Sequence, residues 1–178
     1  MIINMRSEEY LKRGLQTFTQ YLPNECIIAE VGSYAGHSAE IFLNSGKIKH
    51  LYCVDPWCVG YDEKDGASSS NMVEVENEFD YIVLNKFDNV SKIKHTSKHA
   101  STLFEDESLD CVYIDANHQY EAVKEDILLW MPKVKLNGII SGHDYWITDD
   151  AAPQKAIDEI FGKPNMVFED SSWMVIKK

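Results

Sequence analysis

Residues 110–145 read DCVYIDANHQYEAVKEDILLWMPKVKLNGIISGHDY, and this stretch decides the fold. Two short apolar runs, at 109–114 and 138–141, flank a segment of helical length at 120–131 that ends before Pro132. Runs that are apolar on both faces are typical of buried parallel strands covered by helices. The stretch therefore predicts two parallel strands joined by a helix.

The same alternation continues in both directions along the chain. Towards the N-terminus, apolar runs at 26–31 and 51–54 and a weaker strand at 92–96 alternate with helical segments at 7–21, 38–43 and 72–87. Towards the C-terminus, a helix at 152–161 is stopped by Gly162 and Pro164 and precedes two closing strands at 166–169 and 173–177. We therefore predict an α/β fold, an open and mostly parallel sheet with helices on both faces. The closing hairpin adds one antiparallel strand.

Length and composition bound the domain organisation and the partners. A chain of 178 residues predicts one domain over 1–178, with a helical segment at 1–24 and a flexible polar loop, GYDEKDGASSSN, at 60–71. Hydrophobic residues make up 44% and charged residues 26%, as in ordinary globular proteins. The net charge of -12 repels polyanions, so we expect neither nucleic acid nor an anionic membrane as a partner.

The cysteines and the N-terminal residues indicate where in the cell the protein is expected. The four cysteines form no C-x-x-C pair, and three of them lie inside apolar runs, where a free cysteine behaves as a small hydrophobe. The first residues, MIINMRSEEYLKRG, carry acids where a signal peptide needs an apolar stretch. We expect a cytoplasmic protein. Whether it forms a homo-oligomer is left open.

Carboxylates follow four of the predicted strands. CIIAE ends at Glu30, LYCVD at Asp55, CVYID at Asp115 and IISGHD at Asp144. Ligands of open parallel sheets bind outside the carboxyl ends of the strands, and neighbouring strands lie about 4.8 Å apart. A strand that ends in an acid is unremarkable by itself, because strands often exit into polar turns. Four together predict a binding site at one edge of the sheet.

The loop after the first strand narrows the choice of ligand. Its sequence, E-V-G-S-Y-A-G at 30–36, has the spacing G-x-x-x-G and not the G-x-G-x-x-G of dinucleotide sites. The carboxylate of Glu30 suits an ammonium group better than a pyrophosphate. Asp55 follows Gly32 by 23 residues, a distance at which an acid typically binds ribose hydroxyls. An adenosyl amino acid fits this pattern better than NAD, although Asp55 also fits a turn residue before Pro56.

The motifs EVGSYAGHSA, VDPW and D-x-x-H-x-Y, together with the NGIISGHDY segment, resemble class I S-adenosylmethionine-dependent methyltransferases, most of all the small branch related to macrocin O-methyltransferases. The resemblance implies a Rossmann-like sheet of seven strands in the order 3-2-1-4-5-7-6 with the last strand antiparallel. It implies that Glu30 and Gly32 contact the methionine part of the cofactor and Asp55 the ribose. Ser97 and Lys98 would lie near the adenine. The full set of expected cofactor-binding residues is Glu30, Gly32, Ser33, Tyr34, Gly36, Asp55, Ser97, Lys98 and Asp115.

Methyl transfer to a hydroxyl group requires a base or a metal ion as well as a methyl donor. His118 lies three residues after Asp115 and is the first candidate base, with His143 as the competitor and helix capping as the alternative role of His118. Asp115, His143 and Asp144 form a candidate metal set. Mg²⁺ prefers oxygen ligands, so the imidazole of His143 leaves metal dependence open. The candidate catalytic residues are thus His118, Asp115 and His143.

These observations favour an S-adenosylmethionine-dependent enzyme that methylates a small hydroxylated acceptor, such as a sugar or another natural product. The first rival is a nicotinamide-dependent oxidoreductase, which would need a different glycine spacing and a phosphate next to Glu30. The second rival is a noncatalytic module that binds S-adenosylmethionine.

Overall fold

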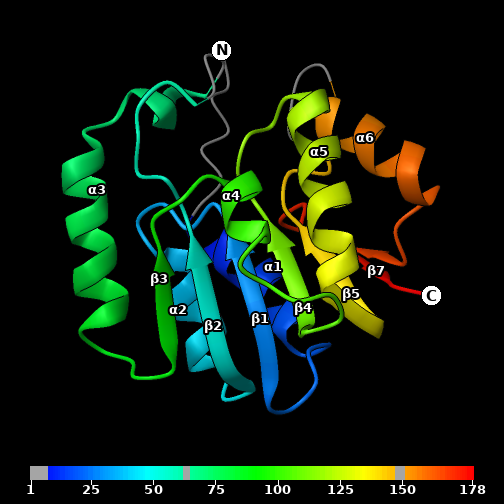
Figure 1. Ribbon diagram of the computed structural model, residues 1–178, viewed down its shortest axis with the longest axis horizontal. Coiled ribbons are helices and arrows are strands. Elements are labelled where there is room, and N and C mark those ends of the chain that lie inside the picture. The colour runs from blue at the N-terminus through cyan, green and yellow to red at the C-terminus, as the bar shows by residue number, and fades with distance from the viewer. Residues whose placement is uncertain (1–7, 62–64, 147–150) are drawn as a thin grey trace.

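The central sheet has seven strands in the order β3-β2-β1-β4-β5-β7-β6 (Figure 1). This computed structural model describes residues 8–61, 65–146 and 151–178, with side chains described from residue 12 onward. The strands β3, β2, β1, β4 and β5 pair in parallel, whereas β7 pairs antiparallel with both β5 and β6. The predicted α/β class and strand order are confirmed. The strands are β1 (Cys26–Val31), β2 (Ile48–Val54), β3 (Val90–Ile93), β4 (Leu109–Ile114), β5 (Val134–Gly142), β6 (Met166–Val167) and β7 (Trp173–Ile176).

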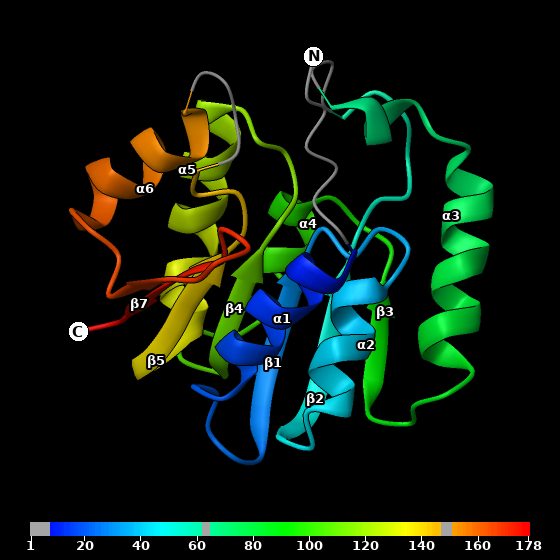
Figure 2. The same ribbon diagram turned by 180° about the vertical axis from the view of Figure 1, so that it is seen from behind.

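Helices cover both faces of the sheet. Helices α4, α5 and α6 lie on the face turned to the viewer in Figure 1, and α1 and α2 lie on the face seen in Figure 2. Helix α3 lies at the β3 edge in both views. The helices are α1 (Glu8–Thr19), α2 (His37–Asn44), α3 (Met72–Phe79), α4 (Ser97–Ser101), α5 (Tyr120–Trp130) and α6 (Ala152–Phe161). Within the described ranges, no helix is long and apolar enough to cross a membrane.

Each face of the sheet buries its own apolar cluster. Phe18 of α1 and Phe42 of α2 pack with Tyr113 of β4 on one face, with ring centroids 5.1–6.1 Å apart. On the other face, Ile127 and Trp130 of α5 are fully buried. Burial of this aliphatic and aromatic surface is the main stabilising contribution to the fold.

Several element boundaries differ from the prediction. The strand expected at 92–96 is β3, Val90–Ile93, because Thr96 caps α4 and its hydroxyl oxygen accepts the backbone N–H of His99 at 3.4 Å. The strands β2 and β5 each begin before their predicted start. The single helix expected at 72–87 is divided into α3 and a π-helix at Asp80–Leu84.

The described part of the loop predicted at 60–71 is held by hydrogen bonds. Asp65 caps a short 3₁₀ helix, Gly66–Ser69, by accepting the backbone N–H of Ala67 at 2.9 Å. The backbone N–H of Gly60 donates to the carbonyl of Ser68 at 3.0 Å. Residues 62–64 of this loop and 1–7 of the predicted N-terminal segment lie outside the described residues.

Candidate active site at the carboxyl ends of the strands

A cavity of about 660 Å³ lies where β1, β4 and β5 end. Its walls come from the loop between β1 and α2, from α1 and α2, from the segment after Gly60 and from the loops that follow β4, β5 and β6. Among the predicted site residues, those that line it are Gly32, Ser33, Tyr34, Gly36, Asp115, His118 and His143. The structure therefore brings most of the predicted loop and both candidate bases into one space.

Glycine is required at the start of the loop between β1 and α2. Gly32 has a positive φ of 94°, and a Cβ atom there would lie 2.0 Å from the carbonyl oxygen of Asp115. Its backbone N–H donates to the carbonyl of Val54 at 2.8 Å. The absence of a side chain lets the β1 loop pack directly on the loop that follows β4. This contact sets the glycine loop against the Asp115 side of the cavity.

Asp55 holds the same loop from the end of β2. Its carboxylate accepts the backbone N–H of Tyr34 at 2.9 Å and that of Trp57 at 2.6 Å. Burial raises the pKa of Asp55, and these two hydrogen bonds oppose the rise. Tyr34 has a positive φ of 44°, so the bond from Asp55 also stabilises an uncommon backbone conformation. Asp55 is half-buried, and each oxygen retains acceptor capacity for a ligand hydroxyl.

Glu30 lies one layer behind the cavity wall. Its side chain is fully buried, and the hydroxyl of Ser38, which does line the cavity, donates a hydrogen bond to its carboxylate. Burial raises the pKa of Glu30 to about 7, although the hydrogen bond from Ser38 opposes the rise. Glu30 is thus not among the residues that line the cavity, and its direct contact with the methionine part of the cofactor stays a prediction. Glu30 acts on the cavity through Ser38.

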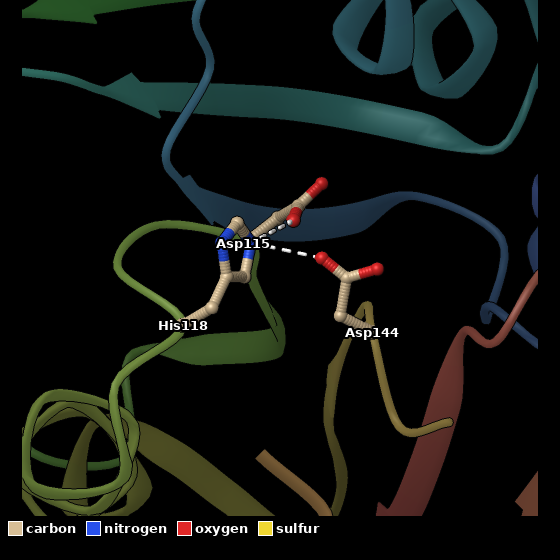
Figure 3. Close-up of side chains that lie close together, drawn as sticks. All are labelled: Asp115, His118 and Asp144. Carbon is tan, nitrogen blue, oxygen red and sulfur yellow. Dashed lines mark ion pairs between the residues drawn. The ribbon is translucent and has the colours of Figure 1, made fainter. Parts of the chain in front are cut away.

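Three side chains converge where β4 and β5 end, as Figure 3 shows. Nε2 of His118 lies 2.9 Å from Oδ2 of Asp144 and 3.6 Å from Oδ1 of Asp115. One ligand atom from each of these residues lies within 4.8 Å of the others. Because Val112 to Ile114 pairs in register with Ile140 to Gly142, the residues that follow the two strands become neighbours. The sequence places the two acids far apart, and the sheet register brings them together.

The carboxylates decide the charge of both histidines. Burial lowers the pKa of His118, but Asp115 and Asp144 outweigh it and raise that pKa to about 11. Burial also lowers the pKa of His143, whereas Asp115 and Asp144 raise it, to about 9. Burial raises the pKa of Asp144, but the two histidines hold it well below its usual range. The two carboxylates therefore favour the protonated form of both imidazoles.

Comparison with known proteins places this site in a family. A family model described as a methyltransferase domain matches residues 29–145, which run from β1 to the loop after β5. The chain belongs to this methyltransferase domain family. The match includes the glycine loop, Asp55 and the Asp115–His118–Asp144 cluster.

Solved methyltransferase structures share this fold, and one uncharacterized protein is similar in sequence. The O-methyltransferase NovP is 16% identical, with a TM-score of 0.61 over 96% of this chain and 78% of that one. An S-adenosylmethionine-dependent O-methyltransferase from Thermotoga maritima is 10% identical, with a TM-score of 0.57 over 83% of this chain and 48% of that one. An uncharacterized protein of Acanthamoeba polyphaga mimivirus is 26% identical over 121 residues, and the match covers 65% of this chain and half of that protein's length. The predicted resemblance to class I methyltransferases is confirmed.

Asp55 and Asp144 are not among the residues that line the cavity, and two further predicted residues, Ser97 and Lys98, make other contacts. The hydroxyl of Ser97 donates to Asp126 at 2.5 Å and accepts the indole N–H of Trp130 at 2.9 Å, so it ties α4 to α5. The exposed ammonium group of Lys98 pairs with Glu125 at 2.8 Å. Neither residue is among those that line the cavity. The assignment of both to the adenine therefore has no support in the geometry.

The methyltransferase cavity also has walls that sequence reasoning did not identify. Asp170, in the turn between β6 and β7, is buried behind α1, and a Cβ atom on Gly14 would lie 2.1 Å from its carboxyl carbon. Lys12 of α1 lines the cavity as well. The positions of Lys12 and Asp170 depend on how α1 and the closing hairpin pack, and no local sequence motif predicts this packing. The other lining residues that were not predicted include Leu15, Tyr61, Asp65, Ala67 and Tyr113.

Proposed function

We propose that this methyltransferase transfers the methyl group of S-adenosylmethionine to a hydroxyl group of a small acceptor. One observation carries the proposal: the glycine loop after β1 lines the same cavity as Asp115 and His118, which Asp144 joins in one cluster. A loop suited to a cofactor and a group of proton acceptors are the two parts that such a transfer needs. A cavity of about 660 Å³ is also in the size range of small-molecule sites.

The glycine loop and Asp55 support the choice of methyl donor. S-adenosylmethionine supplies an electrophilic methyl group on a sulfonium. The backbone of Gly32 and Ser33 lies open to the cavity, so a ligand can approach it closely. Asp55 holds this loop through the N–H of Tyr34 and can accept hydrogen bonds from ribose hydroxyls. These residues bind and orient the donor, and alignment of the reacting groups accelerates an in-line displacement.

The acidic cluster supports the choice of a hydroxyl acceptor. An acceptor hydroxyl must release its proton, and Nε2 of His118 is placed to take it when the imidazole is neutral. Because the carboxylates raise the pKa of His118 to about 11 in the ligand-free protein, His118 has to lose its own proton when the positively charged donor binds. The carboxylates of Asp115 and Asp144 orient this imidazole and stabilise its protonated form. His143, whose Nδ1 lies 3.1 Å from the other oxygen of Asp144, holds that carboxylate from the opposite side. We assign the role of proton acceptor to His118. His143 positions the carboxylate of Asp144.

As an alternative to the base role of His118, the cluster fits a divalent cation, which would take the lone pair of Nε2. Ligands at adjacent positions of a six-coordinate Mg²⁺ lie about 3 Å apart, and the donor atoms here are separated by 2.9 and 3.6 Å. Asp115, Asp144 and His118 would hold the ion, with His118 in place of the predicted His143. One imidazole beside two carboxylates also suits Mn²⁺ or Fe²⁺. A bound cation supplies positive charge that polarises a hydroxyl and offsets the two carboxylates.

The remaining features of the protein support a small, soluble acceptor. A net charge of -12 disfavours nucleic acids and anionic membranes as partners. We propose a cytoplasmic enzyme that acts on a small molecule such as a sugar. A homo-oligomer is compatible with this proposal but not required by it.

The decisive experiment measures transfer from S-[methyl-³H]adenosylmethionine to a panel of small hydroxylated molecules, together with binding of S-adenosylhomocysteine by titration calorimetry. We expect Asp115→Asn and His118→Gln each to lower kcat by about 100-fold or more while cofactor binding changes little. His99→Gln is the control, because His99 is exposed and stacks on His95, away from the cavity. Full turnover by both variants would contradict the assignment. Cofactor binding without transfer to any hydroxyl would favour the noncatalytic module.

A further inference from the structure

We propose that Lys12 of α1 binds the carboxylate of the methionine part of S-adenosylmethionine, which makes the N-terminal helix part of the cofactor site. This inference rests on the proposed function, since it needs S-adenosylmethionine as the donor. It concerns a residue outside the glycine loop and outside the strands that end in acids.

The packing of α1 brings Lys12 to the cavity. Helix α1 lies beside α2 on the face of the sheet shown in Figure 2. Lys12 and Leu15 of α1 line the same cavity as Ser33 of the glycine loop and Ser38 of α2. A ligand that occupies the glycine loop therefore has Lys12 on its α1 side.

Lys12 has no ion-pair partner among the side chains that the structure describes, which begin at residue 12. Among the described residues that line the cavity, Lys12 is the only lysine or arginine. Other lysines are paired, as Lys86 is with Glu40 and Lys98 with Glu125, each at 2.8 Å. A lysine at a cavity wall can bind an anionic group of a ligand.

The other charges in the cavity limit where a carboxylate can bind. Asp65, Asp115 and Asp170 line it, and each repels an anion. The imidazolium groups of His118 and His143 lie against Asp115 and Asp144, which offset their charge. The methionine end of S-adenosylmethionine carries an ammonium and a carboxylate. The acids suit the ammonium, and Lys12 is the cation left for the carboxylate.

The test compares two ligands that differ only in this carboxylate, namely S-adenosylmethionine and decarboxylated S-adenosylmethionine. Titration calorimetry measures Kd for both ligands with the wild type, Lys12→Gln, Lys12→Arg and Arg13→Gln. We expect the wild type to bind S-adenosylmethionine about tenfold more tightly than the decarboxylated form, and Lys12→Gln to lose most of that preference. Lys12→Arg keeps the charge and should keep the preference. Arg13→Gln removes one positive charge from the adjacent residue, which pairs with Glu169, and should keep it too.

The outcomes separate this inference from the proposed function. If the wild type binds S-adenosylmethionine and Lys12→Gln binds both ligands as the wild type does, Lys12 does not hold the carboxylate and this inference is wrong. If Lys12→Gln raises Kd for both ligands by the same factor, the effect is structural and this inference is also wrong. If the wild type binds neither ligand, the proposed function itself fails. A Lys12 that binds an anionic acceptor instead would also leave the preference between the two ligands unchanged and would overturn the inference.

Discussion

The acids that end four strands have separate tasks once the chain is folded. Glu30 is sealed behind Ser38, Asp55 accepts two backbone N–H groups, and Asp115 and Asp144 together hold His118. Their sequence context is similar, since each follows an apolar run. Their environments differ because each strand end meets a different loop. The pKa of a carboxyl group follows that environment, and burial is the largest cause of the rise in the pKa of Glu30 to about 7.

The buried carboxyl of Glu30 predicts a pH-dependent stability. Its pKa is 4.5 when exposed and about 7 in the folded protein, so the folded state retains the proton where the unfolded state has lost it. The free energy of unfolding should therefore fall by about 3 kcal/mol as the pH rises from 4.5 to 7, and then stay level. Glu30→Gln keeps the acceptor for Ser38 and removes this loss. Urea unfolding at pH 4.5 and pH 8 measures the free energy of unfolding of both proteins. Relative to the wild type, the variant should be more stable at pH 8 than at pH 4.5. A constant difference at both pH values would show that Glu30 is not buried as a neutral acid.

Asp55 predicts a combined effect on stability and binding. Asp55→Ala leaves the backbone N–H groups of Tyr34 and Trp57 without their acceptor, which should cost about 1–3 kcal/mol of folding free energy. The glycine loop then loses its support and the ribose its partner, so the Kd for S-adenosylhomocysteine should rise by about tenfold or more. Calorimetry on the folded variant measures it. Unchanged affinity would remove Asp55 from the cofactor site.

At the scale of elements, the loop between β1 and α2 shows how a local pattern and a distant contact combine. The spacing of Gly32 and Gly36 predicts a turn into a helix, and α2 begins at His37. The need for glycine at position 32 has a tertiary cause, namely the carbonyl oxygen of Asp115. By contrast, the boundaries of β3 and α4 depend on a cap by Thr96, and the sequence prediction treated this threonine as the end of the strand.

Two glycine substitutions separate these causes. Gly32→Ala combines a positive φ with a contact of 2.0 Å to backbone, so we expect a loss of about 3 kcal/mol or more. Gly46→Ala has a φ of 73° and no atom within 4 Å, so only backbone strain of about 1 kcal/mol is expected. Thermal or chemical unfolding of both variants measures the difference. Equal losses would mean that the Asp115 loop yields and does not constrain the glycine loop.

At the scale of the whole molecule, the cavity depends on elements from the entire chain. Helix α1, the glycine loop, the ends of β4 and β5, and the turn between β6 and β7 all contribute walls. The glycine at position 14 leaves space on α1 for the carboxylate of Asp170, although glycine costs helical stability. The packing of the terminal elements therefore shapes the cavity as much as the central motifs do.

The cluster that joins β4 to β5 predicts stabilisation by divalent cations. Mn²⁺ or Mg²⁺ at about 100 times its Kd should raise Tm by at least about 5 °C, because it binds the folded state only. Asp115→Asn and Asp144→Asn should abolish this rise, and Asn tolerates the positive φ of 61° at position 144. Asp88→Asn, at an exposed residue, is the control and should retain it. A rise that persists in both cluster variants would place the cation elsewhere.

The sequence by itself determined the class of the fold, the strand order through family resemblance, and the end of the sheet where the cavity lies. Hydrophobic periodicity and the acids after each strand are local signals, so they can be recognised within short segments of the sequence. The tertiary structure decided which acid is buried, that His118 lies between Asp115 and Asp144, and that Lys12 and Asp170 reach the cavity while Ser97 and Lys98 do not. These outcomes depend on strand register and on how helices pack across the sheet. Such contacts join residues far apart in the chain, so no short segment contains them.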